Sequence, residues 1–93
     1  MEIRDKVVVV TGGGGGIGRA LCQRFALEGA RAIVAADLDL AAAQDTVASI
    51  AAVPALAIGA NVAREADVQR LVQGSLDQFG QIDVFCSNAG IYF

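Results

Sequence analysis

Apolar residues along the chain fall into four short continuous runs, separated by longer stretches of mixed polarity. Runs of this length that are bounded by turn residues are typical of strands buried on both faces of a parallel sheet. The pattern predicts strands over residues 6–10, 31–37, 55–61 and 82–88. The third run has a weaker strand pattern because alanine is common in it.

The segments between these runs carry apolar residues at helical spacing, which predicts helices over residues 17–28, 40–51 and 64–79. We expect the first helix to bury a stripe made of Ile17, Ala20, Leu21, Phe25 and Leu27. We expect the last to bury Val68, Leu71, Val72, Leu76 and Phe79. Gly29 and Gly80 are natural helix stops, and Asp39 is a natural N-cap.

Strands and helices therefore alternate as βαβαβαβ with short connections, which is typical of an α/β fold with a doubly wound parallel sheet and helices on both faces. Right-handed crossovers are expected between the strands. The 93 residues contain no internal linker or repeat, so we expect residues 1–93 to form a single domain.

Composition narrows the range of functions. The chain has no histidine, which argues against zinc sites and Ser-His-Asp triads. The net charge is −3 with no basic cluster, so neither nucleic acid nor a membrane surface is an expected partner. No membrane span or signal peptide is evident, which predicts a cytoplasmic protein. Cys22 and Cys86 are predicted to be buried free thiols.

Five consecutive glycines, Gly12 to Gly16, lie between the first predicted strand and the first predicted helix. With Gly18 they fit the dinucleotide-binding pattern G-x-G-x-x-G, but a second register fits equally well, so spacing alone does not choose between them. In both registers the loop turns sharply and exposes N–H groups. A pyrophosphate can then approach without meeting a Cβ, at the partly positive start of a helix.

Asp37 supports this interpretation because it ends the second predicted strand, 19 residues after Gly18. A carboxylate there can accept hydrogen bonds from both ribose hydroxyls of an adenosine and would repel a 2′-phosphate. The alternative phosphate-binding pattern G-x-x-x-x-G-K-[ST] fails, because Arg19 and Ala20 follow Gly18.

Three segments resemble the short-chain dehydrogenase/reductase family. "TGGGGGIG", which begins at Thr11, is similar to the family's T-G-x-x-x-G-x-G segment. "SNAG" resembles its N-N-A-G segment, with Ser87 in place of the first asparagine. "GANV" lies where the family usually has Asp-Val or Asp-Leu, and Asn61 replaces the acid. The resemblance implies a Rossmann-like sheet with strand order 3-2-1-4, here as an apparently truncated three-layer domain.

The resemblance also implies roles for individual residues. Thr11 and Asn88 would tie the first and fourth strands together, and the Asn61 amide oxygen would accept a hydrogen bond from the adenine amino group. Gly15 and Leu38 stand where NADP-preferring members carry a basic residue, which favours NAD over NADP. The expected cofactor-binding residues are Thr11, Gly12, Gly15, Gly16, Ile17, Gly18, Asp37, Leu38, Asn61, Val62, Asn88, Ala89 and Gly90.

Catalytic residues are not expected in this segment. The family's chemistry uses a serine, and a tyrosine with a lysine four residues later that lowers the tyrosine pKa. The only tyrosine here is Tyr92 and the only lysine is Lys6, so no Tyr-x-x-x-Lys is formed. No metal ligand is predicted either.

Three functional interpretations remain open. The chain is the NAD-binding N-terminal half of an oxidoreductase acting on alcohol or carbonyl groups, with the substrate site in a longer parent chain. Alternatively, it is a stand-alone nucleotide-binding or oligomerisation module, for example a homo-oligomer formed through the fourth strand, whose edge is otherwise bare. The third interpretation is an interaction domain that binds no nucleotide.

Overall fold

The computed structural model describes residues 2–88. Four parallel strands form one sheet in the order β3-β2-β1-β4, as expected. The strands are β1 (Val7–Thr11), β2 (Ala32–Asp37), β3 (Ala55–Gly59) and β4 (Val84–Ser87). They are joined by α1 (Gly16–Leu27), α2 (Leu40–Ala48) and α3 (Glu65–Phe79).

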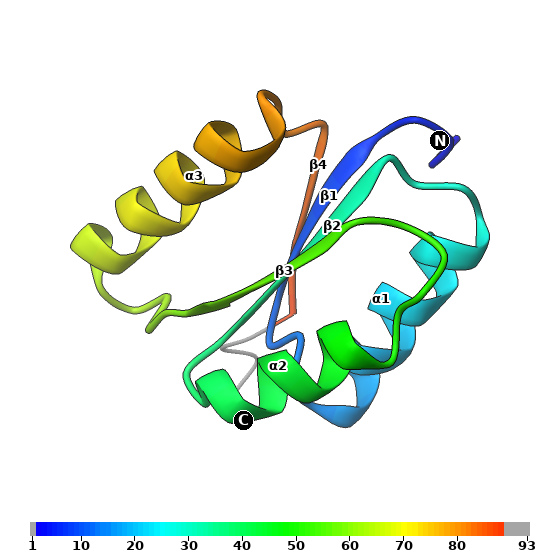
Figure 1. The fold of residues 1–93 in the computed structure, drawn as a ribbon. Coiled ribbons are helices and arrows are strands. Elements are labelled where there is room, and N and C mark those ends of the chain that lie inside the picture. The colour runs from blue at the N-terminus through cyan, green and yellow to red at the C-terminus, as the bar shows by residue number, and fades with distance from the viewer. Residues whose placement is uncertain (1, 89–93) are drawn as a thin grey trace.

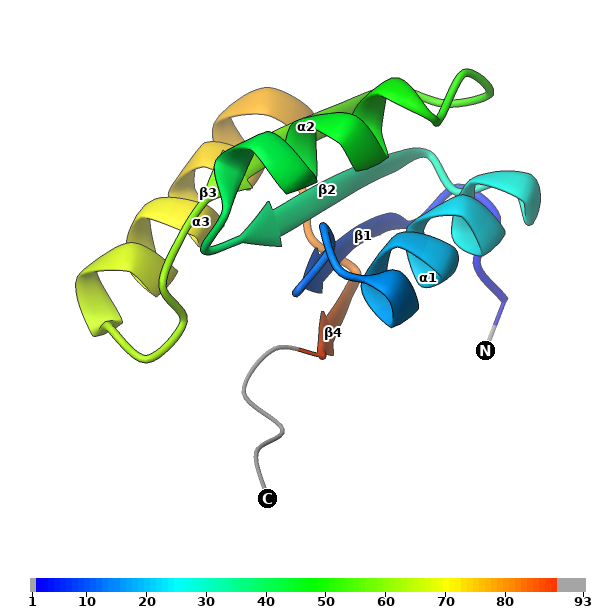
Figure 2. The same cartoon turned by 90° about the horizontal axis from the view of Figure 1, so that it is seen from below.

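Helices cover both faces of the sheet: α1 and α2 pack on one face and α3 on the other (Figure 1). Side chains of the two central strands alternate between these layers. Val8 and Val10 pack with residues of α1 and α2, whereas Val9 packs with Leu71 of α3. Seen from below, α1 and α2 lie side by side on the same face of the sheet (Figure 2). The central strands β1 and β2 are almost completely buried, whereas the edge strands are partly exposed.

The buried stripe predicted for α1 is wrong in part, since Leu21 and Phe25 pack against the core but the other three residues do not. The buried residues of the helix are Gly18, Cys22 and Ala26, which are small residues at successive i+4 positions. Ile17 and Leu27 are 73% and 80% exposed, and Ala20 is exposed too. The larger Leu21 and Phe25 are partly buried and pack against the core cluster that contains Cys22 and Ala26.

The helix predicted over residues 40–51 ends three residues early, at Ala48. The N–H groups of Ser49 and Ile50 donate to carbonyls three residues back, on Thr46 and Val47, both at 3.0 Å. This tighter bonding is typical of a helix end. The Ser49 hydroxyl also donates to the Thr46 carbonyl, at 2.6 Å.

The stripe predicted for α3 needs one correction as well. Leu71 is fully buried, but Leu76 is 38% exposed and Ser75 takes the inward position beside it. The Ser75 hydroxyl is satisfied by donating to the Leu71 carbonyl at 2.8 Å, so its burial leaves no unpaired donor.

Helix ends and strand ends follow local chemistry closely. Asp39 caps α2 by accepting the N–H of Ala42 at 3.2 Å, and Gly29 and Gly80 end their helices with φ of +89° and +78°. The strands differ from the predicted ranges by one or two residues at their ends. Thr11, expected to begin the loop, is the last residue of β1.

An aspartate just before β4 fixes the start of β1. Asp83 Oδ2 accepts the Val7 N–H at 2.8 Å, and the Asp83 N–H donates back to the Val7 carbonyl at 2.9 Å. These bonds, together with one from the Gln81 side chain, hold the pKa of the Asp83 carboxyl below its usual value.

Both cysteines are free thiols. Cys22 is fully buried, and burial raises its pKa to about 11, with Cys86 adding to the shift. Cys86 was expected to be buried but is only partly so, because it lies on the edge strand β4. None of the helices within residues 2–88 has the length and apolar character needed to cross a membrane.

Candidate functional site

The site is built where the parallel strands end. Because all four strands run in the same direction, the loops that follow them meet along one edge of the sheet. The chain leaves β1 toward β2 on one side, while β4 lies on the other side of β1, so the winding reverses beside this strand. In open α/β sheets, ligands bind at the carboxyl ends of the strands where the winding reverses.

The glycine-rich loop leaves β1 in a tight turn. Gly12 has φ of +68°, a conformation that favours glycine, and its carbonyl accepts the N–H of Gly15 at 3.1 Å. The N–H of Gly13 donates to the carbonyl of Ala36 at the end of β2, at 2.9 Å. The loop is therefore held against β2 before α1 begins.

Three glycines of this region are packed against the rest of the chain. A Cβ on Gly13 would lie 2.9 Å from the Ala35 Cβ, and one on Gly14 would lie 2.5 Å from the Ala42 Cβ. A Cβ on Gly18 would overlap the carbonyl oxygen of Gly12. At these positions the fold itself requires glycine.

Gly15 and Gly16 differ, because the chain leaves space around them. A Cβ on Gly15 would meet its nearest neighbour at 3.6 Å, and one on Gly16 would meet nothing within 4 Å. Gly15 is the N-cap of α1 and makes no side-chain cap. The first N–H groups of a helix have no partner within the helix, and in α1 these include the N–H groups of Gly16, Ile17 and Gly18. A phosphate fits such a cradle.

Asp37 lies beside the loop, as predicted. Its Oδ2 accepts the N–H of Gly14 at 3.0 Å, and its Oδ1 accepts the N–H of Asp39 at 2.9 Å. These two bonds fix the carboxylate at the end of β2 while leaving lone pairs on both oxygens for further donors. Leu38, the next residue, is 76% exposed, so an apolar side chain flanks the acid.

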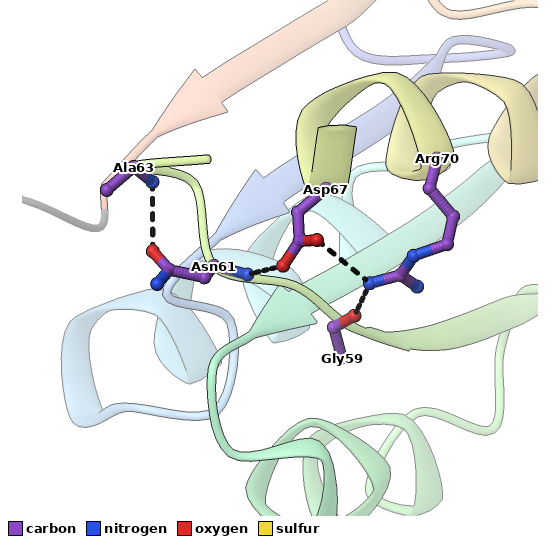
Figure 3. A network of polar contacts seen from close by, with 5 residues as sticks. All are labelled: Gly59, Asn61, Ala63, Asp67 and Arg70. Carbon is purple, nitrogen blue, oxygen red and sulfur yellow. Dashed lines mark hydrogen bonds and ion pairs between the residues drawn. The ribbon is translucent and has the colours of Figure 1, made fainter. Parts of the chain in front are cut away.

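At the end of β3, Asn61 belongs to a polar network (Figure 3). Its N–H donates to Asp67 Oδ2 at 2.8 Å, and its Oδ1 accepts the N–H of Ala63 at 3.0 Å. Arg70 donates to the Gly59 carbonyl at 2.7 Å and lies 3.9 Å from Asp67 Oδ1. Val62, which follows Asn61, is partly buried.

Thr11 and Asn88 connect β1 with the end of β4, as the resemblance implied. The N–H of Asn88 donates to Thr11 Oγ1 at 3.0 Å, and Thr11 Oγ1 donates to the Cys86 carbonyl at 3.4 Å. The expected site residues Ala89 and Gly90 lie outside the described residues.

Three polar residues at this edge were not singled out from the sequence. Asp67 and Arg70 hold the loop after β3, and their i, i+3 spacing at the start of α3 is a signal that could have drawn attention to them. Thr46 of α2 donates to the Gly13 carbonyl at 2.7 Å. Nothing in the sequence near Thr46 marks that contact, which depends on where α2 lies.

The geometry at the start of α1 suits anion binding. Open N–H groups at a helix start suit phosphate, and a fixed carboxylate nearby suits sugar hydroxyls. Within residues 2–88, no three side chains of His, Cys, Asp or Glu gather in a way that could hold a metal ion.

Comparison with known proteins bears directly on this site. Residues 6–93 match the short chain dehydrogenase family. The chain is 38% identical over 92 residues to a sorbitol dehydrogenase from Cereibacter sphaeroides, covering 99% of this chain and 35% of that protein. It is also 40% identical over 91 residues to a peroxisomal hydratase-dehydrogenase-epimerase from Neurospora crassa, covering 98% of this chain and 10% of that protein.

Solved structures show the same likeness. A 3-ketoacyl-(acyl-carrier-protein) reductase from Brucella melitensis, complexed with NADH, matches with a TM-score of 0.83 and 37% identity, over 89% of this chain and 34% of that one. A hydroxysteroid dehydrogenase from Escherichia coli matches with a TM-score of 0.89 and 28% identity, over 96% and 38%. The chain thus spans little more than a third, at most, of these four proteins. By its family match, its Rossmann-type sheet and its glycine-rich loop, the chain belongs to the short-chain dehydrogenase family.

Proposed function

We propose that this chain forms the NAD(H)-binding part of an oxidoreductase that acts on alcohol and carbonyl groups. Family membership supports a nicotinamide dinucleotide as the cofactor, since proteins of this family are dehydrogenases. The observation that carries the proposal is the open space at Gly15 and Gly16, at the start of α1 and beside the fixed carboxylate of Asp37.

In this proposal the loop and the start of α1 hold the pyrophosphate. The N–H groups of Gly16, Ile17 and Gly18 donate to it, and the partial positive charge of the helix start attracts it. The missing Cβ atoms of Gly15 and Gly16 allow the close approach. The cofactor supplies hydride transfer, while this chain orients it.

The adenosine half of the cofactor is assigned to the neighbouring strand ends. Asp37 accepts hydrogen bonds from the ribose hydroxyls, and the exposed side chains of Ile17 and Leu38 provide apolar contact. Asn61 and Val62 are assigned to the adenine, and the family resemblance assigns Asn88, Ala89 and Gly90 to the adenosine side of the cofactor. Thr11 and Gly12 support the loop from β1.

The same carboxylate supports NAD rather than NADP. A 2′-phosphate on the adenine ribose would stand against Asp37, and two negative charges at about 4 Å repel by several kcal/mol near a protein surface. Leu38 offers no cation to offset that repulsion. We therefore expect a preference for NADH over NADPH.

The remaining assignments concern the protein as a whole. We propose that residues 1–93 are one cofactor-binding half-domain, and that the Ser, Tyr and Lys of the family's chemistry belong to a longer parent chain that also holds a small alcohol or carbonyl substrate. The protein is proposed to be cytoplasmic and to act as a homo-oligomer.

The test is a pair of titrations of the full-length protein with NADH and NADPH, read by cofactor fluorescence. Asp37→Ala is expected to weaken NADH binding by about 10- to 100-fold, because hydrogen bonds to a charged group are lost. It is expected to change NADPH binding much less, so that the preference narrows. Asp45→Ala removes an exposed acid from α2 and serves as the matched control. A wild-type protein that binds neither nucleotide would refute the proposal.

A further inference from the structure

One peptide unit in the glycine-rich loop is held at both of its polar ends. The Gly13 carbonyl accepts a hydrogen bond from Thr46 Oγ1 at 2.7 Å, and the Gly14 N–H of the same peptide donates to Asp37 Oδ2 at 3.0 Å. Thr46 is fully buried, so water does not compete for its hydroxyl. The peptide is therefore fixed from inside by α2 and from outside by the end of β2.

This restraint acts where the backbone is otherwise easiest to rotate. Because Gly13 and Gly14 both lack a Cβ, a rotation of the peptide between them meets little intrinsic steric resistance. Such a rotation would turn the Gly13 carbonyl oxygen away from α2. The preceding carbonyl, on Gly12, is already directed at the N–H of Gly15, at 3.1 Å.

The direction of these carbonyls matters for an anion. A carbonyl oxygen carries partial negative charge, so one that pointed toward the start of α1 would oppose the N–H groups that attract a phosphate. The carbonyls of Gly12 and Gly13 are both paired within the chain, at 3.1 Å to the Gly15 N–H and at 2.7 Å to the Thr46 hydroxyl. Thr46 keeps the second of these carbonyls turned away.

Helix α2 is placed to enforce this arrangement. Its residue Ala42 packs against Gly14 so closely that a Cβ on that glycine would lie 2.5 Å from the Ala42 Cβ. Thr46 follows one helical turn later, on the same face. Thr46 therefore contacts the loop from its buried side and does not line the open space at Gly15 and Gly16.

We propose that Thr46 is a positioning residue for the phosphate-binding loop, which it serves by holding the Gly13–Gly14 peptide in the anion-binding orientation. This inference rests on the proposed function, because it assumes that the loop receives the pyrophosphate of a dinucleotide. It concerns a residue that touches neither cofactor nor substrate.

The experiment compares Thr46→Val, which keeps the shape but loses the hydroxyl, with Thr46→Ser, which keeps the hydroxyl. Ser75→Ala is the matched control, since Ser75 is an equally buried hydroxyl on the opposite face of the sheet. NADH and ADP are titrated into each full-length variant at a temperature where all of them are folded. Thr46→Val is expected to weaken the binding of both ligands by about 5- to 30-fold, the usual range for the loss of one buried hydrogen bond.

Thr46→Ser is expected to restore affinity to within about 2-fold of the wild type, and Ser75→Ala to bind as the wild type does even where it lowers the melting temperature. A general loss of stability would not separate the two hydroxyls in this way. Wild-type affinity for NADH in a folded Thr46→Val variant would overturn the inference and leave the proposed function standing.

A measurement without ligand keeps the inference testable if Thr46→Val does not fold. Amide hydrogen exchange by NMR reports on the Gly14 N–H, which is bonded to Asp37, and on the Gly16 N–H, which belongs to the first residue of α1 and has no partner within the helix. In the wild type, the Gly14 N–H is expected to exchange at least 10-fold more slowly than the Gly16 N–H. Equal rates would mean that the peptide is not held, and would overturn the inference even if the wild type binds NADH.

Discussion

The glycines around the start of α1 form two groups with opposite surroundings. Gly13, Gly14 and Gly18 face other parts of the chain so closely that a Cβ has no room, whereas Gly15 and Gly16 face open space. In the first group glycine is needed for the loop to lie against β2, α2 and its own turn. In the second group the chain's own packing makes no such demand, and the proposed function gives a reason for glycine there, namely the close approach of a pyrophosphate.

The largest effect is expected at the most crowded of the packed glycines. Gly18→Ala would press its Cβ onto the carbonyl oxygen of Gly12, which is backbone and cannot move aside cheaply. We expect a loss of about 3 kcal/mol or more in the free energy of unfolding, measured by urea denaturation. Gly18→Val should abolish folding or NADH binding. A well-folded Gly18→Val variant that still binds NADH would contradict the placement of Gly18 among the packed glycines.

A smaller loss of stability is expected at Gly14. Gly14→Ala would bring two Cβ atoms within 2.5 Å of each other, at a cost of about 1–3 kcal/mol in the free energy of unfolding. The double variant Gly14→Ala/Ala42→Gly lacks one of these two Cβ atoms. We expect its loss of unfolding free energy to be smaller than the sum of the losses in the two single variants. Strict additivity in this double-mutant cycle would mean that the contact is not the cause.

The smallest effect on stability, and the sharpest contrast, is expected at Gly16. Gly16→Ala adds a methyl group in open space at the start of a helix, so the unfolding free energy should stay the same or rise by up to about 1 kcal/mol. NADH affinity should nevertheless fall by about 10-fold or more, since each 1.4 kcal/mol lost to a clash is tenfold. Thermal denaturation and NADH titration of the same sample provide the two readings. An unchanged NADH affinity would mean that the phosphate does not bind beside Gly16.

Local signals in the sequence predicted much of the fold. The helix N-cap at Asp39 and the helix stops at Gly29 and Gly80 agree with the structure, because each depends on the chemistry of one residue. The strand order also agrees, but it was implied by the family resemblance and not by a local pattern. The inward faces of α1 and α3 were partly wrong. Periodicity selects the large residues of a helix, but the residues that α1 buries are the small Gly18, Cys22 and Ala26.

The candidate site could likewise be predicted only in part. The position of Asp37 beside the loop and the link between Thr11 and Asn88 were predicted, the first by spacing and the second by resemblance. The contacts of Thr46 and Arg70 were not, because each joins elements whose distance no local pattern encodes. The assignment of the thirteen residues to cofactor binding stays a prediction until a ligand is measured.

Strand order also has a consequence for how the chain is made. One neighbour of β1 is β4, and the Val7–Asp83 hydrogen bond that aligns them spans 76 positions. At about 5–20 residues per second, roughly 4–15 s of translation separate the two. Until then one edge of a valine-rich strand has no native partner and is open to pairing with other chains. Changes that delay the arrival of β4 should therefore increase aggregation of the nascent chain even where the finished fold is just as stable.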